Sequence, residues 1–235
     1  MIKRAFDLFF SIILLIILAP LFVVAGILIK MNSPGPVFFK QKRVGKDNKT
    51  FMVYKFRSMS VGTPDGAKED LGEESAYVTR VGKIIRRFTI DELPNLFNVV
   101  RSEMSLVGPR PPHYMQYDLI KMRTEAGIHR VKPGIAGYAQ IMKTGGEDLV
   151  AKAKCDKYYV EHMSLWLDIK IIIKTISKTT QKKLLKNLFI DSFYSLPHLK
   201  ILAIIYSLFI FYKTIQKSSF FLKYHVFQFE GKDTL

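Results

Sequence analysis

An uncharged run from Leu8 to Ile29 limits the architectures open to this chain. As a straight helix it would be about 33 Å long, enough to cross a hydrocarbon core of roughly 30 Å. Pro20, which follows Ala19 near the middle of the run, argues against a straight helix because an internal proline removes a hydrogen bond and bends the axis. The run therefore predicts either a transmembrane helix or a bent helix that stays within the membrane.

The flanking charges do not decide between these topologies. Lys3 and Arg4 precede the apolar run and Lys30 follows it, so basic residues lie at both ends. A re-entrant helix that bends at Ala19–Pro20 accommodates both observations, since neither half is long enough to cross the membrane. A cleaved signal peptide fits less well, because the apolar run continues past any small-residue cleavage site. Spacing alone leaves the re-entrant and the spanning helix open.

The chain is strongly basic, with 36 basic and 20 acidic residues and a formal net charge of +16. Such an excess suggests an anionic partner, which would be lipid, nucleic acid or a phosphorylated small molecule. The apolar N-terminus favours anionic membrane lipid, and the absence of a recognisable reading motif argues against nucleic acid. The single cysteine, Cys155, cannot form an internal disulfide, which fits a reducing compartment.

Patterns after residue 30 predict an α+β fold that is mostly helical and contains a small β-hairpin. The expected elements are strands at Val37–Lys42 and Phe51–Phe56, a polar loop at Ser60–Tyr77, and helices from Thr89 or Leu93 to about Glu103 and at Asp118–Gly127, Leu149–Glu161 and Leu165–Lys178. The last helix is amphipathic, with apolar residues on one side and a ridge of lysines on the other. This pattern predicts a helix in the membrane interface, and the alternative is a helix packed on the protein core.

An adjacent carboxylate pair, Asp91–Glu92, follows Arg86 and Arg87 and precedes a predicted helix. The plain interpretation is a capping box, in which Thr89 and Glu92 satisfy free N–H groups at the helix start. The alternative is a reactive site, because an ionised carboxylate among arginines can bind Mg²⁺ or attack phosphorus. These residues alone favour capping and salt bridging, and neighbouring features shift that balance.

A rigid loop, Gly108–Pro112, holds Arg110 between prolines. A stiff backbone suits an arginine whose planar fork must meet a phosphate with two hydrogen bonds. A second stiff turn, Lys132–Gly137, precedes Gln140. We interpret Gln140 as a polar side chain that recognises a ligand. The five histidines lack zinc-ligand spacing. No Walker A or G-x-G-x-x-G loop is present, so nucleotide binding would depend on other motifs.

Six motifs occur in order along the chain. They are Arg4–Asp7 (RAFD), Tyr54–Met59 (YKFRSM), Asp91–Pro94 (DELP), Met104–Pro111 (MSLVGPRP), Lys132–Gly137 (KPGIAG) and Asp156–Val160 (DKYYV). Together they resemble the bacterial sugar transferases, the monotopic polyprenyl-phosphate phosphoglycosyl transferases. The match covers about residues 2–178, and the chain resembles the small form, which lacks the extra transmembrane helices that precede the domain in larger members.

The resemblance implies an enzyme that moves a sugar 1-phosphate from a UDP-sugar to a polyprenyl phosphate, usually undecaprenyl phosphate, and releases UMP. It implies that Asp91 is the nucleophile of a covalent phosphosugar intermediate. Glu92 matches its acidic partner, and the pair is associated with Mg²⁺. Further polar active-site positions are matched by Lys55, Arg86, Arg110 and Asp156.

The resemblance also implies a location and a domain arrangement. Members sit in the bacterial inner membrane with the catalytic domain on the cytoplasmic face, and their membrane helix is re-entrant and broken at a proline. We therefore expect a re-entrant membrane helix over residues 1–30, a cytosolic catalytic domain over 31–180 and an extension over 181–235. Within the extension, Ile201–Tyr212 is too short to span a membrane and is expected to add membrane contact or to support a homo-oligomer.

Two departures from the family pattern bear on function. The membrane break is Ala19–Pro20 where members commonly have Ser-Pro, and Lys143 stands where many have an arginine, so a point charge replaces a planar fork. We assign Gln140 and Lys143 to substrate binding and leave the identity of the sugar open. The alternative function is a basic membrane-bound scaffold of polysaccharide assembly, in which Asp91–Glu92 only begins a helix.

Overall fold

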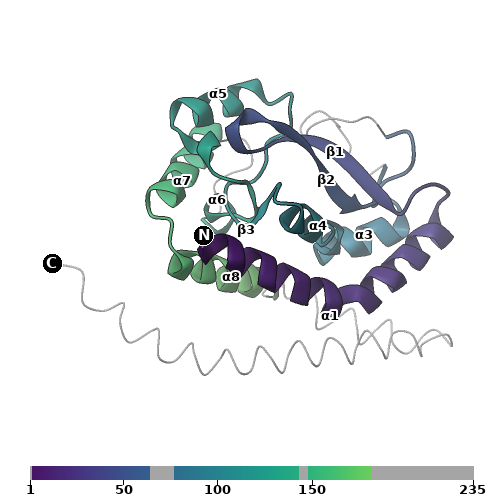
Figure 1. Cartoon of the computed structure of the whole chain (residues 1–235). Helices are drawn as coiled ribbons and strands as arrows, with labels where there is room; N and C mark the ends of the chain where they lie inside the picture. The colour runs from purple at the N-terminus through teal and green to yellow at the C-terminus, as the bar shows by residue number, and fades with distance from the viewer. Residues whose placement is uncertain (1, 64–76, 143–147, 181–235) are drawn as a thin grey trace. The chain divides into compact units, whose positions relative to one another are not determined.

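The computed structural model describes residues 2–63, 77–142 and 148–180. In chain order the elements are α1 (Ile2–Asn32), β1 (Phe38–Val44), η1 (Lys46–Asn48), β2 (Thr50–Phe56), α3 (Arg80–Arg87), η3 (Ile90–Glu92), α4 (Asn95–Val100), β3 (Ser105–Val107), α5 (Tyr117–Glu125), η4 (Ile128–Arg130), β4 (Gly134–Ala136), α6 (Tyr138–Ile141), α7 (Leu149–Glu161) and α8 (Leu165–Thr180) (Figure 1). The predicted α+β, mostly helical class is confirmed. Lys143 and the extension lie outside the described residues, so the predictions made for them stay predictions.

The predicted hairpin is confirmed, with Phe38 of β1 opposite Phe56 of β2. A second, parallel pair joins β3 to β4, and local patterns did not predict it. These two short strands approach so closely that a Cβ built on Gly134 would lie 2.0 Å from the backbone nitrogen of Gly108. Glycine is therefore required at this contact, which fixes the start of the Gly108–Pro112 loop.

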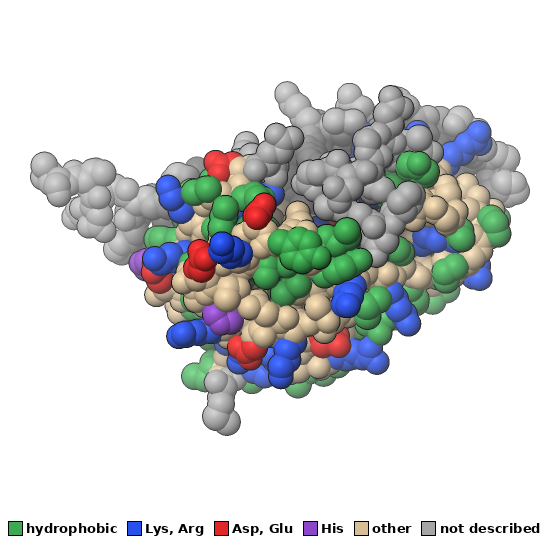
Figure 2. Space-filling model, turned by 90° about the horizontal axis from the view of Figure 1, so that it is seen from above, with side chains coloured by type: hydrophobic (Ala, Val, Ile, Leu, Met, Phe, Trp, Pro, Cys, Tyr) green, Lys and Arg blue, Asp and Glu red, His purple; other side chains and the backbone are tan. Residues whose placement is uncertain are grey.

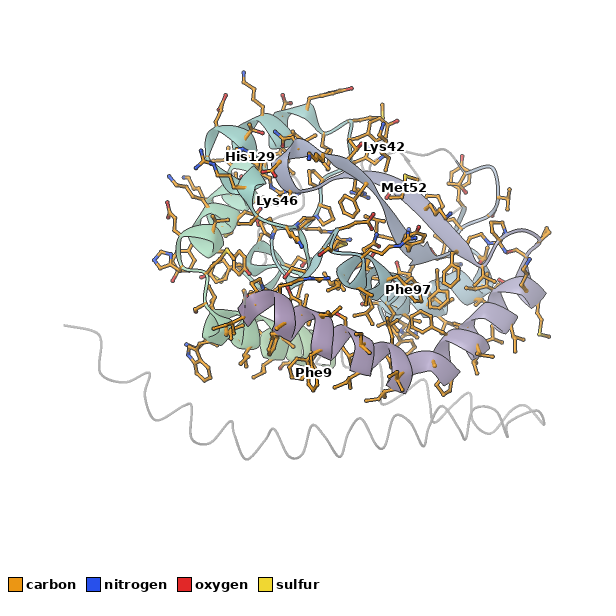
Figure 3. The ribbon with its side chains drawn as sticks, in the orientation of Figure 1. Phe9, Lys42, Lys46, Met52, Phe97 and His129 are labelled. Carbon is orange, nitrogen blue, oxygen red and sulfur yellow. The ribbon has the colours of Figure 1, made fainter. Side chains whose placement is uncertain are left out.

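The main core gathers buried side chains from β2, α4, β3, β4, α7 and α8. Its members are Val53, Leu96, Val99, Met104, Leu106, Val107, Ala136, Tyr159 and Ile171. A smaller cluster of Ala25, Ile29, Phe56 and Ile85 joins α1 to β2 and α3. Phe97 of α4 lies between α1 and the hairpin, where it meets the rings of Phe22 and Phe38 (Figure 3).

The apolar N-terminal run forms one helix, α1, which bends partway along its length and contains Pro20 (Figure 1). Among the described helices, only α1 is long and apolar enough to cross a membrane. Arg4 near its start bonds to α4, and Ile29 near its end packs on Phe56 and Ile85. Both halves of α1 therefore contact the same domain. The opposite side is apolar and exposed, and Phe9 points away from the domain (Figure 3).

Helix α8 is confirmed at Leu165–Thr180, and its inward side is not purely apolar. Asp168 and Ile171 are buried. Trp166 is 54% exposed, and the ammonium of Lys170 lies 5.5 Å from its ring centroid. Exposed aromatic and basic side chains thus share one surface of the helix, instead of lying on opposite sides as predicted.

The face drawn in Figure 2 carries a patch of hydrophobic side chains near its centre, with charged side chains around it. Lys and Arg there stand beside Asp and Glu and do not form one continuous basic patch. On the described part of this face, basic side chains therefore lie among acidic ones.

Candidate active site

The carboxylate pair sits on a short 3₁₀ turn, η3, just before α4. The predicted capping box is wrong, because the Thr89 side chain accepts no hydrogen bond from the helix start and Glu92 is turned elsewhere. Helix α4 begins only at Asn95, after Pro94, and ends at Val100, sooner than predicted. Thr89 adopts a left-handed conformation with φ of 58°, which is unfavourable for a β-branched residue. The turn is therefore held by contacts outside the local sequence.

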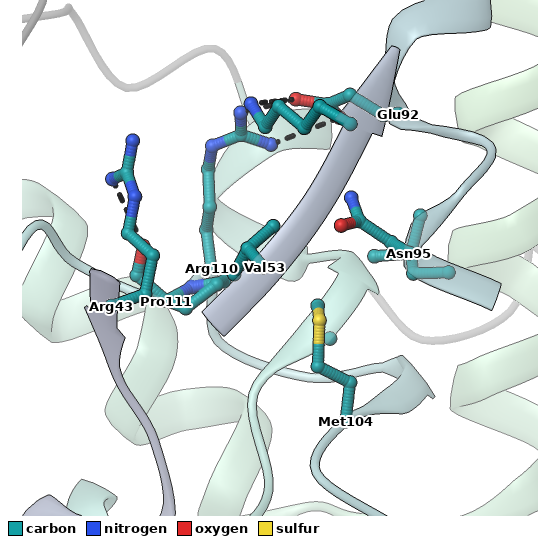
Figure 4. A pocket seen from close by; sticks show the side chains of 10 residues that line it. Arg43, Val53, Glu92, Asn95, Met104, Arg110 and Pro111 are labelled. Carbon is teal, nitrogen blue, oxygen red and sulfur yellow. Dashed lines mark hydrogen bonds and ion pairs between the residues drawn. The ribbon is translucent and has the colours of Figure 1, made fainter. Parts of the chain in front are cut away.

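Glu92 is fixed by two cations from distant parts of the chain. The Lys55 ammonium on β2 lies 3.2 Å from Oε1, and the Arg110 guanidinium donates to both carboxylate oxygens, with Nη1 3.1 Å from Oε2 (Figure 4). Burial alone would raise the pKa of Glu92, but the charges of Arg110 and Lys55 outweigh burial and hold the pKa well below its usual range. Glu92 is therefore ionised and engaged at neutral pH.

Asp91 has the opposite environment. Among the described residues, no side chain forms an ion pair or a hydrogen bond with its carboxylate. Burial and the neighbouring charge of Glu92 raise the pKa of Asp91, while Lys55 and Arg86 oppose that shift. The two adjacent carboxylates thus differ, since one is locked in ion pairs and the other is available to a ligand.

The backbone around Arg110 is held from several sides. The Gly134 N–H donates to the Pro109 carbonyl at 2.9 Å, and Arg123 Nη1 donates to the Arg110 carbonyl at 2.7 Å. Arg43 of β1 donates to the Pro111 carbonyl at 3.3 Å. The loop that presents the Arg110 fork is therefore rigid because of packing as well as because of its prolines.

Asp156 lies beneath this loop, 1% exposed, and pairs with Arg123, whose Nε lies 3.0 Å from Oδ2. Asp156 is therefore placed to act on Arg110 through Arg123, and its direct contact with substrate stays a prediction. Arg123 was missed by sequence reasoning, because its partner lies 33 residues away in the chain. The sequence around a buried arginine with such a distant partner does not indicate that the two residues pair.

The remaining predicted site residues lie on different elements. Burial lowers the pKa of Lys55, and the charge of Glu92 partly offsets this shift. Arg86 on α3 donates to the Ser58 hydroxyl at 2.9 Å and lies close enough to influence Asp91. Gln140 on α6 is half-buried and does not line the pocket at Glu92. Lys55, Arg86 and Arg110 are thus gathered around the carboxylates, whereas Gln140 is not placed there.

A narrow pocket adjoins Glu92. It is lined by Arg43, Val53, Lys55, Glu92, Asn95, Met104, Arg110, Pro111, Gly134 and Ile135 (Figure 4). Its free volume is about 10 Å³, and the Glu92 ion pairs lie along its wall. Within residues 2–63, 77–142 and 148–180, no group of three or more His, Cys, Asp or Glu side chains is arranged to hold a metal. The pocket thus presents cations and one locked carboxylate beside the available Asp91.

A family model described as "Bacterial sugar transferase" matches residues 1–182. The UDP-N-acetylgalactosamine-undecaprenyl-phosphate N-acetylgalactosaminephosphotransferase of Aeromonas hydrophila is 42% identical over 180 residues, covering 74% of this chain and 43% of that protein. The undecaprenyl-phosphate glucose phosphotransferase of Komagataeibacter xylinus is 47% identical over 188 residues, covering 75% and 35%. The exopolysaccharide production protein PSS of Rhizobium leguminosarum bv. phaseoli is 41% identical over 195 residues, covering 77% and 96%. The chain spans less than half the length of the first two relatives.

Proposed function

Because this chain belongs to the bacterial sugar transferase family, we propose that it transfers a sugar 1-phosphate from a UDP-sugar to undecaprenyl phosphate and releases UMP. Two relatives are named as undecaprenyl-phosphate phosphotransferases, one of N-acetylgalactosamine and one of glucose. We place the reaction at the first membrane step of surface glycan assembly.

The observation that carries this proposal is the division of roles between Asp91 and Glu92. Glu92 is bound by Lys55 and Arg110, which fixes the geometry of the turn. Asp91 has no such partner among the described residues and stands beside the same cations. A carboxylate that is held near phosphate-binding groups but is not itself paired suits nucleophilic attack on phosphorus.

The proposed reaction has two steps. In the first, an Asp91 oxygen attacks the phosphorus that bears the sugar, a P–O bond to that carboxylate forms, and UMP leaves with the electron pair of the broken anhydride bond. In the second, an oxygen of the lipid phosphate attacks the same phosphorus and the Asp91 carboxylate leaves. Arg110 and Lys55 stabilise the charge that develops on the phosphoryl oxygens. One covalent intermediate lets a small pocket serve two dissimilar substrates in turn.

The carboxylate pair also fits Mg²⁺, which commonly uses one or two protein carboxylates together with water and substrate phosphates. Asp91 and Glu92 would hold the ion. A cation bound there would oppose the rise in the pKa of Asp91 that burial and Glu92 cause. Bound Mg²⁺ would neutralise part of the diphosphate charge.

We further propose that α1 is re-entrant and that the domain lies on the cytoplasmic face of the inner membrane. This topology is supported by the contacts that both halves of α1 make with one domain, since a straight span would carry its two ends to opposite sides. The exposed side of α1 would meet lipid tails, as its Ile16, 69% exposed, illustrates. Trp166 and Lys170 of α8 would contact anionic headgroups.

The deciding experiment uses the full chain in detergent or nanodiscs and follows UMP release from a UDP-sugar without lipid acceptor. We expect a stoichiometric burst in the wild type, and mass spectrometry should find a phosphosugar on the peptide that contains Asp91. The burst and the adduct should both vanish in Asp91→Asn and persist in the control Asp118→Asn, which changes an exposed aspartate on α5. Full activity in Asp91→Asn would refute the assignment, and no turnover of any UDP-sugar by the wild type would favour the scaffold.

A further inference from the structure

Asn95, the first residue of α4, carries a buried polar atom that the reaction described above does not use. The residue is 4% exposed, and its Oδ1 has no hydrogen-bond partner in the part of the chain that the structure describes. Burying an amide oxygen without a partner is costly, so native proteins rarely do it unless a ligand or water completes the bond. The position of this oxygen therefore suggests a function.

The Asn95 amide points into the pocket beside Glu92, on the side away from Arg43 and Pro111 (Figure 4). Around it the pocket combines an apolar floor, formed by Val53 and Met104, with the cations that bind Glu92. An amide oxygen cannot pair with an ionised phosphate oxygen, because both are acceptors. The Asn95 oxygen is therefore suited to a hydrogen-bond donor that lies next to a phosphate group.

A hydroxyl group meets this requirement. It both donates and accepts, so it can pair with either end of an amide. The free volume of about 10 Å³ is close to the smallest that holds a water molecule, which is the size of a hydroxyl group. A sugar nucleotide carries hydroxyls on both sides of its diphosphate, on the transferred sugar and on the ribose.

We propose that Asn95 contacts the substrate by hydrogen-bonding one hydroxyl of the sugar nucleotide while the neighbouring cations hold its diphosphate. This inference rests on the proposed function and adds a residue that selects the donor. When the diphosphate draws Arg110 and Lys55 away from Glu92, the pocket opens and the hydroxyl reaches the Asn95 oxygen. Asn95 then rejects donors that lack this hydroxyl, because its buried oxygen would stay unpaired.

The test compares the wild type with Asn95→Leu, which keeps the approximate size but removes the amide. Leu96→Met serves as the control, because it alters a buried neighbour on α4 that does not line the pocket. The kcat/KM for UMP release is measured with a panel of UDP-sugars and their single-deoxy analogues. In the wild type, removal of the recognised hydroxyl should lower kcat/KM by about threefold to tenfold. In Asn95→Leu the same removal should have no further effect.

Inhibition by UDP tells which hydroxyl is read. An unchanged inhibition constant in Asn95→Leu assigns the hydroxyl to the transferred sugar, and a matching loss of UDP affinity assigns it to the ribose. The inference is overturned if every deoxy donor loses the same factor in both proteins. It is also overturned if the variant needs more Mg²⁺ at unchanged donor preference, which would make Asn95 a metal ligand. Asn95→Ala is measured in parallel, with melting temperatures, in case the leucine does not fold. Absence of UMP release in the wild type would instead refute the proposed function.

Discussion

The Arg123–Asp156 pair gives the strongest test of how this site is held. Both side chains are buried, and the pair lies directly beneath the Arg110 carbonyl. Replacing Arg123 with methionine keeps much of its volume but leaves the Asp156 carboxylate without its cation. Breaking a buried ion pair in this way costs about 3–5 kcal/mol of unfolding free energy. For a chain of this size that corresponds to a fall in melting temperature of roughly 6–20 °C.

The assay is thermal or denaturant unfolding of the detergent-solubilised full chain, with Lys121→Met on the exposed side of α5 as the control. The control should change stability by less than about 0.5 kcal/mol. The double variant Arg123→Met/Asp156→Leu should be more stable than Arg123→Met alone, because it leaves no unpaired buried charge. Both variants should have a lower kcat than the wild type, because the Arg110 carbonyl has lost its donor in each.

The pH dependence of the Arg123→Met defect follows from the same pair. Burial already raises the pKa of Asp156, and Arg123 opposes that rise, so loss of Arg123 raises the folded-state pKa further. A carboxyl with a raised folded-state pKa loses its stabilising contribution as pH rises through that pKa. The deficit of Arg123→Met should therefore be larger at about pH 8 than at about pH 5. A deficit below about 1 kcal/mol, or one that shrinks as pH rises, would refute this account of the pair.

Three further predictions concern the carboxylate turn. The UMP burst should decline as pH falls through the raised pKa of Asp91. The midpoint of this decline should move to lower pH in Glu92→Gln, because the Glu92 charge raises the pKa of Asp91. Burst amplitudes measured across pH test the decline and the shift. Glu92→Gln should also bind UDP about tenfold more tightly in the presence of a chelator, because the Glu92 carboxylate no longer competes with UDP for Arg110 and Lys55. Calorimetry that finds weaker binding would contradict this prediction. Thr89→Asn should raise the unfolding free energy by about 1 kcal/mol, since asparagine tolerates the left-handed backbone better, and the melting temperature measures this effect.

Local signals were sufficient to predict the elements that depend on local interactions. Helix α7 runs from Leu149 to Glu161 as predicted, and the Asp148 side chain caps it by accepting from the Ala151 N–H. The hairpin was predicted from two β-rich segments around a turn, and Asp47 and Asn48 adopt the positive φ angles that such turns need. In these segments the sequence pattern and the tertiary contacts favour the same structure.

The carboxylate turn could not be predicted in this way. The local sequence favours a capping box between Thr89 and Glu92, but Glu92 is drawn to Lys55 and Arg110, which lie 37 and 18 residues away. Two charge-assisted contacts outweigh one helix cap, whose typical contribution is about 1 kcal/mol. The local pattern thus fails at the pair for which we propose a chemical role, because tertiary contacts hold the turn in a conformation that local preferences oppose.

The first turn of α1 explains why polar residues begin an apolar helix. Arg4 donates to the Val99 and Val100 carbonyls at the end of α4, at 2.6 and 3.0 Å. Asp7 accepts from the Ser105 hydroxyl at 2.7 Å and from a backbone N–H of β3 at 3.2 Å. Helix α4 begins three residues after Glu92, and β3 leads directly into the loop of Arg110. One turn of the apolar helix therefore holds α4 and β3, which adjoin the turn of Glu92 and the loop of Arg110. A shift of α1 would for this reason change the geometry of the site. The helix is for this reason an integral part of the fold around the candidate site as well as its proposed contact with the membrane.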